Sequence, residues 1–178
     1  MKIIGICGSP RDGNSEYMLR TFLKEMQDKG NQVEIVLLKN ENLLFCTGCQ
    51  TCETTKTCRL TDNMNKIFSK MLNSDLIVFS FPIYFDYMPA LMKNLIDRTN
   101  SRYEKLKNKK FVFLAVGALK GKEAKPGQKM VLDQMKDIIG IYGLKLEGYY
   151  FAEANKPGEI KNYPEQLEKI KDIARKIK

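Results

Sequence analysis

The chain has 178 residues, of which 43% are hydrophobic and 29% are charged, and this composition is typical of one globular domain with its own core. It has no apolar run of membrane-spanning length and no signal-peptide pattern at its start, so we expect a cytoplasmic protein that does not bind a membrane. The absence of histidine excludes Ser-His-Asp and Cys-His catalysis and histidine-ligated metals.

The formal net charge of +9 favours acidic ligands or partners, because a positive field raises their encounter rate. Lysines are concentrated at 105–110, but this run is short and has no interleaved aromatic residues. Such a run is more typical of a solvated linker than of a nucleic-acid site. We therefore expect no nucleic acid among the partners.

The first part of the chain predicts a strand, a loop and a helix. Residues 2–7 are apolar and β-branched, as in a buried parallel strand. Residues 8–15 are rich in glycine and hydroxyl groups and lead into a helix that ends near Gly30. Free backbone N–H groups at such a helix start bind anions, so the loop predicts a phosphate site. It matches neither the dinucleotide nor the nucleoside-triphosphate pattern, and a plain capped loop remains the alternative.

A second strand is expected at 32–38, and the segment 39–60 that follows contains four of the five cysteines. Their spacing is C-x2-C-x2-C-x5-C, formed by Cys46, Cys49, Cys52 and Cys58. A loop this compact can direct four thiolates at one object, and a cubane iron–sulfur cluster has the right size. Structural zinc and a thiol cluster without metal remain open, whereas a disulfide needs an oxidising compartment.

The rest of the chain alternates between helices and strands. We expect strands at 76–81, 111–117 and 144–151, and helices at 61–72, from about 89, at about 128–142 and at 164–177. Five strands alternating with helices predict an α/β fold, a three-layer, doubly wound parallel sheet in one domain, 1–178. Its ligand should lie over the carboxyl edge of the sheet.

Loop 82–89 begins where a central strand should end, and it contains the aromatic residues Tyr84, Phe85 and Tyr87. These side chains could form the wall of a site for a planar ring, and packing against a neighbouring subunit is an equally good interpretation. In the strand order 2-1-3-4-5, loops 8–15, 82–89 and 117–127 converge at one edge. A phosphate loop beside an aromatic loop fits a phosphorylated, flat cofactor.

Several motifs together resemble the flavodoxin-like NAD(P)H-dependent FMN reductase family. They are Gly8-Ser9-Pro10-Arg11 with Gly13-Asn14-Ser15, Pro82-Ile83-Tyr84, Leu91-Met92-Lys93 and Ile96-Asp97-Arg98. With the four cysteines between the second strand and the next helix, the chain is more similar to the iron–sulfur flavoprotein branch. Phe81 and Phe85-Asp86 depart from residues common in the family, which implies a narrower outer face of the flavin site.

The resemblance implies FMN and a 4Fe-4S cluster on Cys46, Cys49, Cys52 and Cys58. It assigns the FMN phosphate and ring to residues of the three loops, namely Ser9, Arg11, Gly13, Asn14, Ser15, Pro82, Ile83, Tyr84, Phe85 and Gly117. Tyr84 and Asp86 are the nearest candidates for directing a proton to the flavin. The resemblance also implies a homodimer or homotetramer.

The predicted function is an FMN-dependent oxidoreductase that relays electrons between the cluster and FMN. The donor would be a ferredoxin-like protein and the acceptor a small oxidant. One alternative is an NAD(P)H-dependent quinone, flavin or nitro reductase without a cluster. A more distant alternative is a non-catalytic, zinc-containing basic binding protein.

Overall fold

The computed structural model describes all residues, 1–178. Its strands are β1 (Lys2–Cys7), β2 (Gln32–Leu37), β3 (Leu76–Pro82), β4 (Lys110–Gly117) and β5 (Lys145–Glu153). Its α-helices are α1 (Asn14–Asp28), α2 (Thr51–Thr55), α3 (Met64–Leu72), α4 (Ala90–Arg98), α5 (Gly121–Tyr142) and α6 (Pro164–Lys176). Short 3-10 turns occur at Leu38–Asn40, Thr99–Ser101, Tyr103–Leu106 and Glu159–Asn162.

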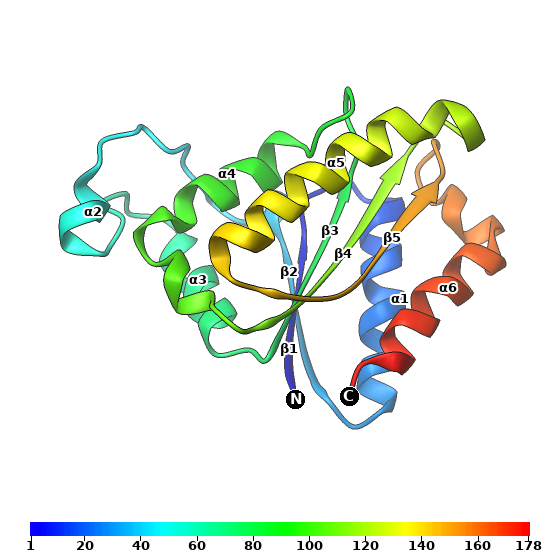
Figure 1. Ribbon diagram of the computed structural model, residues 1–178, viewed down its shortest axis with the longest axis horizontal. Coiled ribbons are helices and arrows are strands. Elements are labelled where there is room, and N and C mark those ends of the chain that lie inside the picture. Colours follow the sequence, from blue (N-terminus) through cyan, green and yellow to red (C-terminus); the bar gives the residue numbers. More distant parts are fainter.

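The five strands form one parallel sheet in the order β2-β1-β3-β4-β5. Helices α1 and α6 lie side by side on one face, and α3, α4 and α5 cover the other (Figure 1). The sequence prediction of a doubly wound, flavodoxin-like sheet is therefore confirmed. The central strand β3 is buried along its whole length, as its apolar run predicts.

Each face of the sheet has its own hydrophobic core. Along β4, Phe111 and Phe113 face α3 to α5, whereas Val112 and Leu114 face α1 and α6. This alternation follows from the two-residue period of a strand. Phe111 packs edge-on against Phe79 of β3, with 5.0 Å between ring centroids. Full burial of such a side chain contributes roughly 1.5–3 kcal/mol.

Helix α5 differs from its sequence prediction. It begins at Gly121, seven residues before the expected start at 128, and continues through Pro126 in its second turn. Proline at this position removes one backbone hydrogen bond, and the helix forms in spite of it. Met130, which the sequence placed in the core, is 43% exposed. The short helix α2 inside the cysteine segment was also not predicted. No helix in residues 1–178 combines the length and apolar character needed to cross a membrane.

Candidate functional site

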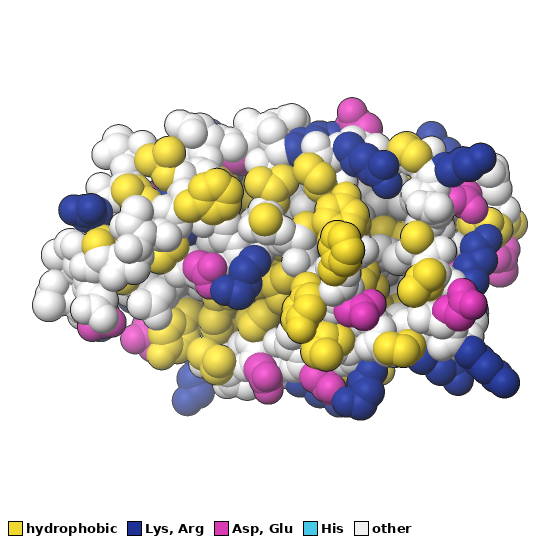
Figure 2. All heavy atoms as spheres, turned by 90° about the horizontal axis from the view of Figure 1, so that it is seen from above, with side chains coloured by type: hydrophobic (Ala, Val, Ile, Leu, Met, Phe, Trp, Pro, Cys, Tyr) yellow, Lys and Arg dark blue, Asp and Glu magenta, His cyan; other side chains and the backbone are white.

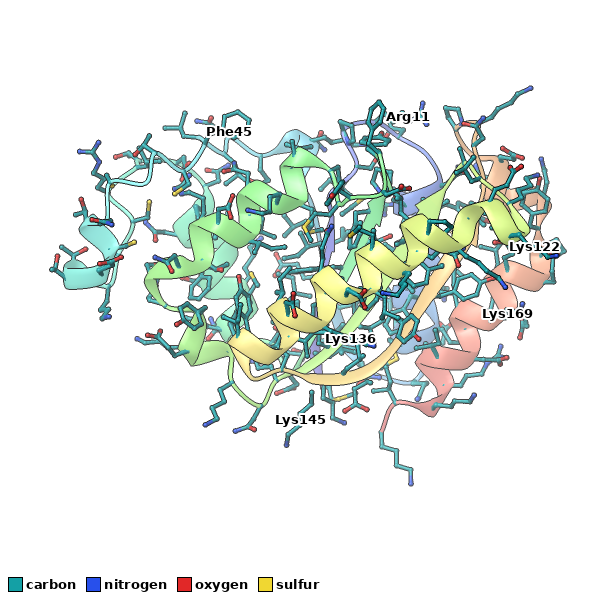
Figure 3. The ribbon with its side chains drawn as sticks, turned by 45° about the horizontal axis from the view of Figure 1, so that its top comes forward. Arg11, Phe45, Lys122, Lys136, Lys145 and Lys169 are labelled. Carbon is teal, nitrogen blue, oxygen red and sulfur yellow. The ribbon has the colours of Figure 1, made fainter.

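Three loops meet above the carboxyl ends of β1, β3 and β4, as the strand order predicts. They enclose a cavity of about 230 Å³. Eight of the sequence-predicted cofactor residues line it: Ser9, Arg11, Gly13, Asn14, Ser15, Pro82, Ile83 and Tyr84. Figure 3 shows Arg11 at this edge of the sheet. We call this cavity the phosphate-side cavity.

A second cavity of about 210 Å³ shares Ile83 and Ala118 with the first, and we call it the ring-side cavity. It contains the other two predicted residues, Phe85 and Gly117, and also Asp86. Its far wall is the first part of α5, the segment that the sequence assigned to a loop. The two cavities together form one continuous lining over the sheet edge, with a polar end and an apolar end.

The polar end lies at the start of α1. No side chain caps this helix, so the amides of its first turn are free to meet an anion. The Ser9 hydroxyl donates to the Arg11 carbonyl at 2.7 Å and accepts from the Arg11 N–H at 3.3 Å. These bonds fix the loop and leave the Arg11 guanidinium exposed at the cavity, with Nη2 donating to the Asn155 carbonyl at 3.4 Å.

Asn14, which lines the phosphate-side cavity, also makes two hydrogen bonds to the loop after β5. Its Nδ2 donates to the Lys156 carbonyl at 3.0 Å, and its Oδ1 accepts from the Ile160 N–H at 3.1 Å. The side chain therefore ties the phosphate loop to the loop after β5. Its backbone amide is the part that remains for an anion.

The loop after β5 is the part of the site that sequence reasoning missed. Ala154 and Asn155 line the phosphate-side cavity. Glu159 holds this loop: its carboxylate accepts from Tyr163 Oη at 2.7 Å and from the amides of Asn155 and Lys156 at 2.8 Å each. The Tyr163 bond, followed by the two amide bonds, lowers the pKa of Glu159 to about 2. The sequence could have indicated this loop, because the carboxyl ends of all strands of a parallel sheet lie at the same edge.

The aromatic loop 82–89 forms a tight hairpin. The Tyr84 N–H donates to the Tyr87 carbonyl at 2.9 Å, and the Tyr87 N–H donates to the Tyr84 carbonyl at 3.0 Å. Between them Phe85 has φ 49° and Asp86 has φ 66°, the conformation of a type I′ turn that normally favours Asn-Gly. Backbone strain of this kind is concentrated at functional sites.

The hairpin tip leans toward α5. A Cβ built on Gly127 would lie 2.4 Å from Asp86 Oδ1, so a larger residue at this position would displace the Asp86 carboxylate. The Phe85 side chain is 98% exposed. Tyr84 lines the phosphate-side cavity and Asp86 the ring-side cavity, so these two proton-transfer candidates lie at different parts of the site.

All four clustered cysteines line one cavity of about 580 Å³, which we call the cysteine cavity. The segment that carries them extends away from the sheet together with α2 (Figure 1). The opposite wall comes from the end of α4, including Ile96 and Arg98, and from the end of α5, including Tyr142. No three Cys, Asp or Glu side chains of residues 1–178 lie in a metal-binding arrangement.

The cysteines differ in their surroundings. Cys49 lies just before α2, and a hydrogen bond with the Thr51 hydroxyl, followed by one with the Thr51 N–H, lowers the pKa of its thiol to about 7. Thiolates are the form that binds metal and acts as a nucleophile. Cys7, outside the cluster, is buried in β1, and burial raises the pKa of its thiol to about 11.

Helix α4 connects the two sites. It begins at Ala90, just after the hairpin of loop 82–89, and ends at Arg98 in the cysteine cavity. Its nine residues span about 13 Å at a rise of ~1.5 Å per residue. Lys93 and Asp97 form an exposed ion pair within the helix at 2.5 Å, whereas Arg98 pairs with Asp62.

Comparisons with known proteins agree with this geometry. The model of the NADPH-dependent FMN reductase family matches residues 1–168. The chain is 30% identical to an iron–sulfur flavoprotein of Methanocaldococcus jannaschii, over 99% of this chain and 95% of that protein. It is 32% identical to an iron–sulfur flavoprotein of Archaeoglobus fulgidus, over 99% of this chain and 79% of that one.

Among solved structures, the NAD(P)H:quinone oxidoreductase from Methanothermobacter marburgensis has a TM-score of 0.79 at 16% identity, with 98% of this chain and 96% of that chain covered. At this identity the likeness concerns the fold. The match to the family model covers nearly the whole chain and excludes the non-catalytic alternative. The chain belongs to the NADPH-dependent FMN reductase family and is an FMN-dependent oxidoreductase.

Proposed function

We propose that this oxidoreductase relays electrons between a 4Fe-4S cluster, held by Cys46, Cys49, Cys52 and Cys58, and FMN above the sheet edge. The observation that carries the proposal is the single cavity lined by all four cysteines. Its wall includes the end of α4, the helix that begins beside the flavin-side hairpin. The donor is a ferredoxin-like protein and the acceptor a small oxidant such as oxygen, peroxide or a quinone.

The residues of the sheet edge fit FMN. The uncapped start of α1 and the Arg11 guanidinium suit a phosphate. Pro82, Ile83 and Tyr84 offer an apolar and aromatic surface to the isoalloxazine. FMN can hold one or two electrons, whereas a cluster passes one at a time, so the pair of groups supplies the redox chemistry.

The cysteine cavity fits a cluster. Four thiols from one short segment are the donor set that such clusters use. Arg98 lines the cavity. Its buried Nε has no hydrogen-bond partner within the chain. A buried donor of this kind is expected to find an acceptor, and cluster or thiolate sulfur would supply one.

We infer that the chain works as a homodimer or homotetramer in the cytoplasm. The face above the sheet edge supports the subunit contact: Figure 2 shows apolar side chains gathered across this face, with lysine and arginine mostly toward its margin. Exposed large apolar residues include Phe45, Phe85 and Tyr87. The net charge of +9 suits an acidic electron donor. Sedimentation velocity on the FMN-loaded protein tests the subunit number.

The experiment that tests the relay is an anaerobic visible absorption spectrum with iron, sulfide and zinc analysis. We expect flavin bands over a broad shoulder near ~400 nm and about four irons per chain. Flavin bands without iron, even after anaerobic reconstitution with iron and sulfide, would contradict the cluster. Stoichiometric zinc in place of iron would assign the cysteines a structural role.

A direct NAD(P)H-dependent reductase is the second candidate, and the family match favours it. The ring-side cavity gives a nicotinamide a place beside the flavin, and the adjoining start of α5 carries Lys122 and Lys125, which would attract a charged dinucleotide. This function predicts rapid bleaching of the flavin by NADPH in protein without iron. Slow bleaching by both NADH and NADPH would favour the relay.

A further inference from the structure

We propose that the Arg98 guanidinium is a positioning and charge-tuning residue that raises the reduction potential of the group held by the four cysteines. The inference rests on the cluster proposed above and assigns a role to a side chain outside the cysteine motif. Arg98 lies in the last turn of α4 and lines the cysteine cavity. Its side chain is 1% exposed, so its charge acts where water screens it least.

The guanidinium is held in one orientation by the chain. Nη1 and Nη2 donate to the two carboxylate oxygens of Asp62 at 2.7 and 2.9 Å, and Nη1 also donates to the Leu44 carbonyl at 2.5 Å. This two-pronged geometry is specific to arginine. The third nitrogen, Nε, has no hydrogen-bond partner. The guanidinium is thus fixed by Asp62 and Leu44, and its Nε–H remains unpaired.

Asp62 is itself fixed. Its carboxylate accepts from the Met64 N–H at 3.0 Å and from the Leu44 N–H at 2.8 Å. Burial alone would raise its pKa, but the hydrogen bond from Arg98 and those from the two amides hold the pKa below its ordinary value. Asp62 therefore stays ionised and keeps Arg98 in place.

Cys58 and Arg98 line the same cavity. Burial alone would lower the pKa of Arg98, but hydrogen bonding to Asp62 and the nearby Cys58 raise it. Buried ion pairs contribute little to stability, because the cost of desolvation offsets the attraction. A buried pair beside a thiol cluster is therefore better explained by its effect on charge in the cavity than by stability.

The physical effect has a definite sign. The potential of an iron–sulfur cluster depends on its net charge, on hydrogen bonds to its sulfurs and on its exposure to solvent. A fixed cation nearby stabilises the form with one more electron. A donor to cysteine sulfur acts in the same direction, so Arg98 makes the cluster easier to reduce.

Arg98 could also act only by holding the cysteine segment in place, because other residues of α4 anchor the same segment. Asn94 Oδ1 accepts from the Cys46 N–H, and its Nδ2 donates to the Leu44 carbonyl, both at 3.3 Å. Arg98 bonds to the same Leu44 carbonyl. Loss of Arg98 could therefore loosen the segment without any electrostatic effect.

The test compares Arg98→Met with Arg98→Lys in the reconstituted protein, using anaerobic redox titration of the cluster signal. Both variants lose the arginine fork, but only Arg98→Met loses the positive charge. We expect a negative shift of the cluster potential in Arg98→Met and a clearly smaller shift in Arg98→Lys. The FMN potential, followed in the same titration, serves as an internal reference and should change less than that of the cluster.

If Arg98→Met does not fold, Asp62→Asn combined with Arg98→Met removes both partners, and such paired removals are often tolerated. This double variant leaves the net charge of the site unchanged but loses the Nε donor, so it should titrate at a more negative cluster potential than the wild type, by less than Arg98→Met. Equal potentials in the lysine and methionine variants, each with its full iron content, would overturn the inference. A wild-type chain that binds FMN but takes up no iron would overturn the proposed function itself, and iron analysis distinguishes the two failures.

Discussion

The proposed flavin site above the sheet edge and the cysteine cavity are built in opposite ways. The flavin site rests on the ends of buried strands, and bonds such as those of Asn14 and Ser80 hold its loops together: Ser80 Oγ donates to the Ser15 carbonyl at 2.7 Å. The cysteine cavity has a rigid wall from α4 and α5, but its other side is an exposed segment with one short helix, α2. Cys46 and Cys49 are exposed.

This difference concerns when each site takes shape. Strand ends and buried hydrogen bonds preorganise the flavin site before any ligand arrives. Four thiols on an exposed segment with little regular structure should reach their final geometry only with their ligand, because metal binding and local folding are coupled. We therefore expect the two sites to respond independently to substitution.

The largest expected effect is that of Cys49→Ser. Loss of one of four ligands should reduce the iron content from about four per chain to near zero, while FMN stays bound because its site lies on other elements. Iron analysis and the flavin absorbance of the same sample provide the measurement. Cys7→Ala, which removes the one cysteine outside the cluster, is the matched control and should keep its iron. Loss of both cofactors in Cys49→Ser would show that the cysteine segment also supports the flavin site.

The next effect concerns the phosphate end of the flavin site. Arg11→Met removes an exposed guanidinium beside the uncapped α1 start. Because a hydrogen bond to a charged group contributes roughly 1.5–3 kcal/mol, FMN affinity should fall about ten- to a hundred-fold. Fluorescence titration measures it. Riboflavin, which has no phosphate, should bind the variant and the wild type equally, and an equal loss for both flavins would place Arg11 elsewhere.

A smaller effect is expected at the strained hairpin. Phe85→Asn replaces a residue at φ 49° with one that tolerates the left-handed region. Relief of about 1 kcal/mol of strain should raise the melting temperature of the FMN-free protein by about 2–4 °C in a chain of this size. FMN should bind the variant more weakly, since Phe85 lines the ring-side cavity. An unchanged melting temperature would mean that the turn is not strained.

The smallest effect is a pH dependence in the loop after β5. The pKa of Glu159 is lowered from 4.5 to about 2 in the folded chain, so the unfolded chain binds this proton first as the pH falls. The stabilising contribution is complete above about pH 5 and is lost as the pH falls from 4.5 toward 2. Thermal melts from pH 6 to pH 3 should therefore decline more steeply for the wild type than for Glu159→Gln. Parallel declines would show that Glu159 is not held as described.

The sequence predicted the sheet because its signals are local. The apolar run of β3 and the alternation of strands and helices lead directly to the strand order and to the edge where ligands bind. The resemblance to the FMN reductase family named the individual residues, and eight of them line one cavity. The sequence prediction failed at the start of α5, because this helix begins before Pro126 and continues through it, whereas proline normally marks a helix boundary.

Other features depend on contacts between distant residues. Nothing local shows that Asn14 would hold the loop near Lys156, or that Asp62 would bind Arg98 across 36 positions. Within α4, Asp97 pairs with Lys93, whereas the buried Arg98 pairs with the distant Asp62. The left-handed turn at Phe85 and Asp86 could not be predicted from the sequence, because such turns normally contain Asn-Gly.

The most direct test of the relay is stopped-flow reduction of FMN by a reduced ferredoxin-type protein, in the wild type and in Cys49→Ser. With NADPH as donor the two proteins should give equal rates, because a hydride reaches the flavin without the cysteines. With the one-electron donor the account predicts fast flavin reduction in the wild type and slow reduction in the variant. Equally fast reduction in both would contradict the claim that electrons reach the flavin through the cysteine cavity.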